Sequence, residues 1–340
     1  MDEFTLINKY LKSLSLKNTG SLNLSDDIYF DSKKNTAISV DTYVEGVHFI
    51  SSFDPNKFLK RILRASLSDL YCKGVKPKSY FLSLALNKKF VNHTWLKKFK
   101  KILQSEQKKF KISLGGGDTT FSSKLTITVI VLGYPVYEPI LRKGCSLNDD
   151  IFVTGNIGDS FIGLSILKKK NNFGSLNNYF IKKYYQPNLQ TQLSRFLHKI
   201  ASSSIDISDG LAQDLTHLCT SSKFGALVDL NKLPISPICK KLVNSQKIQL
   251  TKIFSKGDDY QILFTSHPKN RHKIKSLSLK LRTKISKIGI INRGKNIVFK
   301  FKNKKFKLES KKMGYIHNFW QRFMLPFMVF FGNLRFFNQI

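Results

Sequence analysis

Acidic residues in this chain of 340 residues stand at the edges of apolar segments, beside serine or glycine. Residues 203–211 place Asp206 and Asp209 three positions apart, with Ser208 between them. Similar placements occur at Asp26-Asp27, Asp41, Asp69 and Gly116-Gly117-Asp118. Carboxylates at turns and strand ends suit hard cations such as Mg²⁺, which prefer oxygen ligands and bridge phosphate oxygens. The pattern therefore indicates metal-assisted phosphoryl chemistry, provided that the fold brings these acids together.

Two of these motifs also have an ordinary structural interpretation. A glycine and a helical pattern follow Asp209, so its carboxylate could instead cap that helix by accepting from free backbone N–H groups. Residues 115–117 are three glycines after a short strand, which favours either a flexible turn or a loop that lies close to phosphate. The stretch matches neither the P-loop nor the GxGxxG pattern, so it is a weak signal by itself.

The elements that must position these acids follow from hydrophobic periodicity and helix-start signals. A short amphipathic helix is expected at 3–14. A strand at 36–42 includes Asp41 near its end, and the Asp54-Pro55 start predicts a helix that carries Asp69 in its last part. Further helices are expected at 95–110, 159–167, 176–184, 188–200, 211–222 and 268–278. Further strands are expected at 79–86, 111–114, 126–133, 150–155, 226–230, 259–265, 284–290 and 296–301. This alternation predicts α/β layers.

The charge of the chain is strongly positive, since 57 Lys and Arg face 22 Asp and Glu, a net charge of +35. Such an excess can indicate a polyanion partner. The lysines are dispersed along the chain, however, and neither a zinc-finger spacing nor an RNA-binding aromatic motif accompanies them. We therefore interpret the charge as composition bias and expect no nucleic-acid partner. Four widely spaced cysteines and a start without a signal-peptide core predict a cytoplasmic protein with reduced thiols.

Taken in order, the motifs closely resemble the thiamine-monophosphate kinase family, within the aminoimidazole ribonucleotide synthetase-like superfamily. The resemblance runs from about residue 3 to 317. It rests on Glu3-Phe4-x-Leu6-Ile7, Asp26-Asp27, Ser39-x-Asp41, Glu45-Gly46-Val47-His48-Phe49, Ser66-Leu67-Ser68-Asp69-Leu70, Gly116-Gly117-Asp118-Thr119-Thr120, Val153-Thr154-Gly155-x-x-Gly158-Asp159-Ser160, Ile205-Asp206-Ile207-Ser208-Asp209-Gly210-Leu211, Asp258-Asp259-Tyr260 and Gly314-Tyr315.

The resemblance implies a two-domain α/β (α+β) fold. An N-terminal domain at 1–140 would bind ATP and magnesium and pair with its copy into a dimeric β-barrel. A C-terminal α/β domain would occupy 141–317. Residues 318–340 form an apolar, aromatic extension, for which a helix packed on the protein and a helix at a membrane interface are both open.

The implied activity is phosphorylation of thiamine monophosphate to thiamine diphosphate by direct transfer from ATP. Several Mg²⁺ ions would be held by Asp27, Ser39, Val40 (through its backbone carbonyl), Asp41, Asp69, Asp118, Asp206 and Asp209. ATP would contact Gly117, Arg142 and Ser208. Thiamine monophosphate would contact His48, Asp258 and Tyr315. No general base is implied, because the attacking phosphate is already anionic and positioning with charge neutralisation can carry the rate.

The chain departs from the family pattern at several positions, among them Val40, where the family often has threonine. Ser25 stands where the family has glycine, and Lys256 and Asp258 stand where the family has glycine and glutamate. Three alternatives therefore stay open beside the kinase: another ATP-dependent enzyme of the superfamily, a homologue that folds without catalysing, and a basic nucleic-acid-binding protein.

Overall fold

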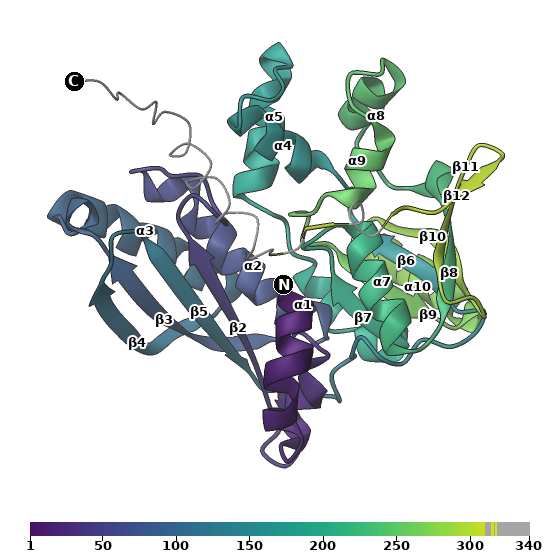
Figure 1. Cartoon of the computed structure of the whole chain (residues 1–340), viewed down its shortest axis with the longest axis horizontal. Helices are drawn as coiled ribbons and strands as arrows, with labels where there is room; N and C mark the ends of the chain where they lie inside the picture. Colours follow the sequence, from purple (N-terminus) through teal and green to yellow (C-terminus); the bar gives the residue numbers. More distant parts are fainter. Residues whose placement is uncertain (310–313, 316, 318–340) are drawn as a thin grey trace, which may run out of the picture.

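The chain forms two β-sheets that lie side by side, each covered by helices (Figure 1). The structure is a computed structural model and describes residues 1–309, 314, 315 and 317. Strands β1 to β5 make the first sheet and strands β6 to β12 the second. The α/β class is therefore confirmed. Among the described residues of this single chain, the first sheet stays open and closes no barrel. The expected extension at 318–340 lies outside the described residues.

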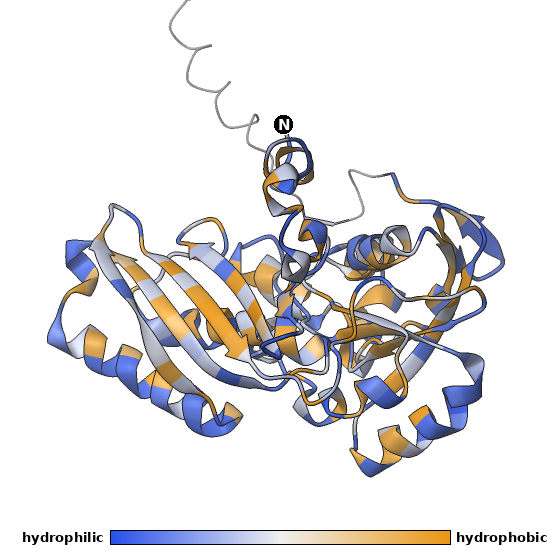
Figure 2. Cartoon of the chain, turned by 90° about the horizontal axis from the view of Figure 1, so that it is seen from below, coloured by the Kyte–Doolittle hydropathy of each residue, from blue (hydrophilic) through white to orange (hydrophobic). Residues whose placement is uncertain are grey.

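The first sheet has the strand order β1-β2-β5-β3-β4. Its strands are β1 (Tyr29–Asp31), β2 (Thr36–Val44), β3 (Pro77–Leu86), β4 (Ser113–Phe121) and β5 (Thr126–Gly133). Helices α2 (Leu59–Cys72) and α3 (His93–Phe110) pack on one face, where Ile127, Val129 and Val131 are buried. The side chains of the opposite face alternate with these and are only partly buried on β5. Figure 2 shows that apolar residues are frequent along the strands of this sheet.

The second sheet has the order β12-β11-β8-β10-β6-β9-β7. Its strands are β6 (Asp150–Thr154), β7 (Ser203–Asp206), β8 (Gly225–Asp229), β9 (Ile262–Ser266), β10 (Ile285–Asn292), β11 (Ile297–Phe301) and β12 (Lys304–Phe306). Its helices are α4 (Asp159–Leu167), α5 (Asn177–Tyr185), α6 (Thr191–Ser194), α7 (Leu211–Ser221), α8 (Pro237–Asn244), α9 (Leu250–Ser255) and α10 (Arg271–Lys280). Strands β6, β7 and β9 are buried throughout, so the edge strand β7 ends inside the protein.

Two expectations for local structure are wrong. The helix expected at 188–200 is only the short α6 and a separate turn at Leu197–Lys199, because Leu193 and Leu197 pack into a small third core and tertiary packing overrides the local pattern. The glycines at 115–117 form no loop but continue as strand β4. Gly117 has a φ of 157°, and a Cβ there would lie 1.9 Å from the carbonyl oxygen of Leu82. The glycine thus allows β4 to lie close against β3.

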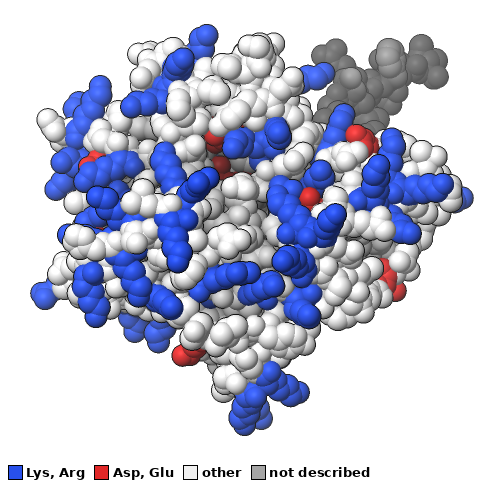
Figure 3. Space-filling model, turned by 180° about the vertical axis from the view of Figure 1, so that it is seen from behind, with Lys and Arg blue, Asp and Glu red and all other residues white. Residues whose placement is uncertain are grey.

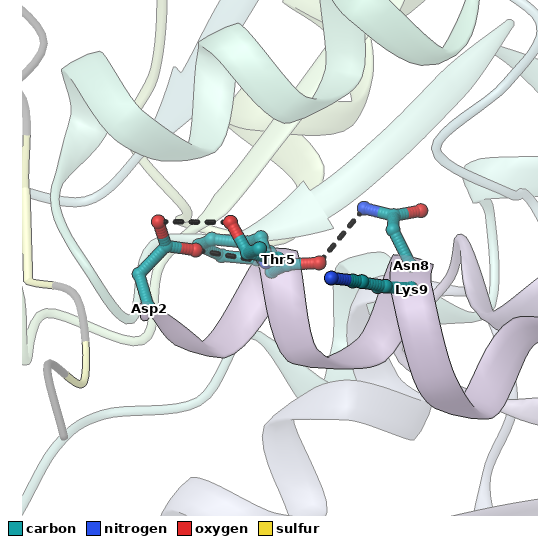
Figure 4. Close-up of a pocket in the computed structure, with 5 residues that line it drawn as sticks. Asp2, Thr5, Asn8 and Lys9 are labelled. Carbon is teal, nitrogen blue, oxygen red and sulfur yellow. Dashed lines mark hydrogen bonds between the residues drawn. The ribbon is translucent and has the colours of Figure 1, made fainter.

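The N-terminal segment is helical, as expected for 3–14. It comprises α1 (Glu3–Leu6), a π-helical turn at Ile7–Leu11 and a 3₁₀ turn at Lys12–Ser15. Figure 4 shows how Asp2 caps α1: its carboxylate accepts from the backbone N–H of Thr5 at 2.8 Å and from the Thr5 hydroxyl at 3.1 Å. The backbone N–H of Glu3 donates to the carbonyl of His317 at 3.1 Å, so the two ends of the described chain meet.

Three observations bear on the expectations drawn from composition. Lysine and arginine side chains are scattered over the face that Figure 3 shows and form no single stripe. A search of the described residues for helices with the length and hydrophobicity to cross a membrane found none. The four cysteines are buried free thiols. The cytoplasmic location stays a prediction.

Candidate active site

A cleft of about 1130 Å³ lies where the two sheets and the N-terminal helix meet. It brings together most of the residues singled out in the sequence, although they are up to 288 positions apart, from Asp27 to Tyr315. The predicted site residues that line it are Asp27, Val40, Asp41, His48, Asp69, Arg142, Asp206, Ser208, Asp209, Asp258 and Tyr315. A smaller surface pocket of about 600 Å³ beside α1 (Figure 4) contains none of them.

Three carboxylates form the centre of the cleft. Asp27 comes from the loop before β1, Asp69 from the last part of α2 and Asp206 from the end of β7, and one oxygen of each lies within 4.8 Å of the others. Burial, followed by repulsion from neighbouring carboxylates, raises the pKa of Asp206 to about 7 and that of Asp69 well above its ordinary value. Oδ2 of Asp206 is buried and has no hydrogen-bond partner among the described residues.

Two further acids stand beside this centre. Asp41, on β2, accepts from the hydroxyl of Tyr43 at 3.2 Å, and burial is the main cause of its raised pKa. Burial, with repulsion from Glu3 next, raises the pKa of Asp209 to about 7. The capping interpretation of Asp209 is wrong. Helix α7 has Gly210 at its N-cap without a side-chain cap, and the Gly210 N–H donates to Asp214 at 3.0 Å instead. Asp209 is thus left to face the cleft.

Two cations surround Asp27. The guanidinium of Arg142 donates to both of its oxygens, and Nζ of Lys73 lies 2.7 Å from Oδ2. Lys73 also lies 2.9 Å from Oδ1 of Asp26. Burial by itself would raise the pKa of Asp27, but Arg142 and Lys73 together hold it well below its ordinary value. Burial by itself would lower the pKa of Lys73, but Asp26 and Asp27 raise it. Asp27 is therefore the acid of the centre that stays ionised.

An ion pair also joins the two sides of the cleft. Arg61 of α2 is buried, forms an ion pair with Asp258 and donates to the hydroxyl of Tyr260 at 3.0 Å. Its guanidinium carbon also lies 4.6 Å from the ring centre of Tyr184. The sequence analysis missed Arg61. Its signal was the spacing, because Arg61, Ala65 and Asp69 recur at four-residue steps and so share one face of α2.

The loop that carries Asp258 is fixed against the turn after β7. Its backbone N–H donates to the carbonyl of Ser208 at 2.8 Å. A Cβ on Gly257 would lie 1.8 Å from that same carbonyl oxygen, so glycine is required for this close approach. Ser208 and Asp258 are therefore held side by side in the cleft.

An aromatic group that includes two imidazoles lies near the N-terminal helix. Nδ1 of His48 accepts from the backbone N–H of Val44 at 3.0 Å, which leaves the proton of the neutral ring on Nε2, 3.3 Å from Nε2 of His317. The ring of Tyr315 packs edge-on against His317, with centroids 4.9 Å apart. Burial, with His317 and Arg61 next, lowers the pKa of His48. The sequence analysis missed His317, because only the fold brings it to His48.

Three predicted site residues lie away from the cleft. Ser39 is buried on β2, and its hydroxyl donates to the carbonyl of Ser66 at 3.3 Å. Gly117 and Asp118 are exposed on β4, the edge strand of the first sheet, and line no part of the cleft within this chain.

The fold and the acid-lined cleft define a protein of the AIR synthase-related class. The family described as "AIR synthase related protein, N-terminal domain" matches residues 25–134. A thiamine-monophosphate kinase of Buchnera aphidicola (subsp. Schizaphis graminum) is 36% identical over 328 residues, which cover 93% of this chain and 98% of the relative. The thiamine-monophosphate kinase of Escherichia coli (strain K12) is 34% identical over 276 residues, 79% of this chain and 84% of the relative. The chain belongs to the thiamine-monophosphate kinase family.

Solved structures agree with this assignment. A structure of AaThiL complexed with AMPPCP and TMP superposes with a TM-score of 0.79 at 25% identity, covering 93% of this chain and 97% of the other. The thiamine monophosphate kinase of Aquifex aeolicus gives a TM-score of 0.76 at 26% identity, covering 90% and 98%.

Proposed function

We propose that this chain is an ATP-dependent kinase that converts thiamine monophosphate to thiamine diphosphate. An oxygen of the substrate phosphate attacks the γ-phosphorus of ATP, the bond to the β-phosphate oxygen breaks, and ADP leaves. The observation that carries the proposal is the meeting of Asp27, Asp69 and Asp206 in one cleft with the predicted substrate contacts. Membership of the thiamine-monophosphate kinase family supports it.

The cleft fits divalent cations of the Mg²⁺ class. Its donors are hard carboxylate oxygens, and Oδ2 of Asp206 is a buried oxygen that lacks a partner in the described part of the chain. We propose Asp27, Asp41, Asp69, Asp206 and Asp209 as the ligands from this cleft, with the carbonyl of Val40 beside them. Bound Mg²⁺ would supply charge neutralisation for the phosphate oxygens. Ser39 belongs to the proposed set only through its position next to Val40 on β2.

The remaining residues of the cleft bind and orient the two substrates. Arg142 presents a planar fork of donors that suits the phosphates of ATP, and Ser208 lines the same cleft. His48, Asp258 and Tyr315 would contact thiamine monophosphate, with Tyr315 beside its cationic ring. No residue needs to remove a proton, since the attacking phosphate is an anion. Catalysis then consists of alignment and charge neutralisation.

A homodimer is part of the proposal. Val40, Ile130 and Phe81 form an apolar row across neighbouring strands on the face of the first sheet that neither α2 nor α3 covers. Sheets bury such a face against another layer, and a second copy supplies that layer. The proposed roles of Gly117 toward ATP and of Asp118 toward a cation depend on this pairing, because β4 does not reach the cleft of its own chain.

An assay of ADP release tests the activity. Purified protein with ATP, Mg²⁺ and thiamine monophosphate should release ADP, and omission of thiamine monophosphate or addition of a chelator should stop the release. Folded protein that is inactive with thiamine monophosphate but active with another phosphate acceptor would refute the proposed substrate. Folded protein that is inactive with all acceptors would identify a non-catalytic homologue.

A further inference from the structure

Lys73 occupies an unusual position at the acid cluster. Its side chain has no exposed surface, and its ammonium group contacts three oxygens. Nζ lies 2.9 Å from Asp26 and 2.7 Å from Asp27, and it donates to the backbone carbonyl of Ser204 at 2.7 Å. All three N–H groups of the ammonium therefore have an acceptor.

These contacts join the two halves of the protein. Lys73 follows α2, which covers the first sheet, whereas Ser204 lies on β7 of the second sheet. Asp26 and Asp27 belong to the loop before β1. One ammonium group thus connects the loop, the helix and the far sheet directly behind the acid centre.

Lys73 differs from Arg142, the other cation on Asp27. Arg142 lines the cleft and can meet a phosphate there, whereas Lys73 does not line the cleft. A ligand can therefore draw Arg142 away from Asp27 but has no access to Lys73. An isolated buried ammonium would be very costly, so its two carboxylate partners keep it charged and in place.

We propose that Lys73 is a permanent counter-ion and positioning residue of the acid cluster, which fixes Asp27 and reduces the attraction of the cluster for free divalent cations. The cluster then binds its cations strongly only when the phosphates of the nucleotide arrive with them. Removal of the ammonium leaves one more negative charge in the cluster, which strengthens its Coulomb attraction for a divalent cation. This inference rests on the proposed cation site.

The test measures Mn²⁺ binding to the whole protein by electron paramagnetic resonance, with and without AMPPCP. Lys73→Met removes the charge, and Lys73→Gln also removes it while keeping a donor for Ser204. Without nucleotide, both variants should bind Mn²⁺ about tenfold more tightly than the unmodified protein. Addition of Mg²⁺ should also raise the melting temperature of both variants by more than it raises that of the unmodified protein.

The matched control is Arg64→Met. Arg64 is a buried cation on α2, the helix that Lys73 follows, paired with Glu106 at 2.7 Å and outside the cleft. Its loss should lower stability without tightening Mn²⁺ binding.

The Mn²⁺ affinities of the variants distinguish the proposed role of Lys73 from a purely structural one. Unchanged or weaker Mn²⁺ binding in both Lys73 variants would show that Lys73 is only structural. Variants that stay unfolded even in Mg²⁺ would also overturn the inference, because the added cation should replace the missing charge. If the unmodified protein bound no Mn²⁺ even with AMPPCP, the proposed cation site itself would be wrong.

Discussion

The guanidinium of Arg61 forms an ion pair with the carboxylate of Asp258 across the cleft. Arg61 belongs to the helix that covers the first sheet, and Asp258 to the loop before β9 of the second. Arg61 is buried, and its Nε has no hydrogen-bond partner among the described residues. Asp258 is the only acidic partner of Arg61 in this part of the chain. The pair therefore holds the two sides of the cleft in register at the proposed substrate end.

Asp258→Ala should destabilise the protein by about 3–5 kcal/mol, because it leaves the buried charge of Arg61 without a counter-ion. Urea denaturation measures the free energy of unfolding. The double variant Arg61→Met with Asp258→Ala should recover part of the loss. If the loss of stability in the double variant equalled the sum of the losses in the two single variants, the two residues would not act as a pair.

Asp209→Asn should lower turnover about a hundredfold or more, because it removes a charge that faces the proposed cations while the side-chain shape is kept. Its melting temperature without cations should not fall, since burial disfavours the ionised form of Asp209. Asp229→Asn is the control, an acid at the end of β8 outside the cleft. An Asp209→Asn enzyme with full turnover would remove Asp209 from the site.

Stability without cations should fall as the pH rises from about 4 to about 7. The pKa of Asp206 is about 7 in the folded chain against an ordinary 3.8, so the folded state holds a proton that the unfolded state has lost in this range. Melting temperatures measured at several pH values in a chelator give the slope of stability against pH. This slope should be shallower in Asp206→Asn. An unchanged slope in that variant would show that Asp206 does not titrate there.

The KM for thiamine monophosphate should rise in acid, at pH values below the ordinary imidazole pKa of 6.5. The pKa of His48 is lower than its ordinary 6.5, so its ring is neutral near pH 7 and gains a charge only in acid. A charged imidazole would repel the cationic ring of the substrate. His48→Asn should show a flatter KM profile, and steady-state kinetics at several pH values compare the two. A parallel rise of KM in both proteins would exclude His48 as the cause.

Ile130→Glu should convert the proposed dimer to a monomer, because it places a charge in the middle of the apolar row on the open face of the first sheet. Sedimentation velocity measures the mass. The control is Leu279→Glu on α10, which is exposed but belongs to the second half. A monomeric unmodified protein, or a dimeric Ile130→Glu variant, would contradict the proposed interface.

Much of this fold could be predicted from the sequence, because long periodic segments such as α3 and β5 carry their own signal. Short elements could not. β7 is a four-residue edge strand whose polar Ser203 and Ser204 are buried by contacts with β9, which depend on the fold. The glycines of β4 were misread as a loop, because their role is close contact with another strand.

The residues of the site were likewise only partly predictable from the sequence. The acids were predictable because Asp27, Asp69 and Asp206 stand in recognisable local motifs. Their counter-ions were not. Lys73 is one lysine among many in the sequence, and only the fold shows that its ammonium is fully buried between two carboxylates. His317 likewise acquires meaning only through its contact with His48.

The hydrogen bond from Glu3 to His317 has a consequence for folding of the enzyme during its synthesis. Residues of the N-terminal helix line one wall of the cleft, and the partner of Glu3 is translated 314 residues after it. The first sheet can assemble early, but this contact cannot form until synthesis has passed residue 317. A nascent chain released before that point carries the acids of the centre without the Tyr315 and His317 side of the cleft.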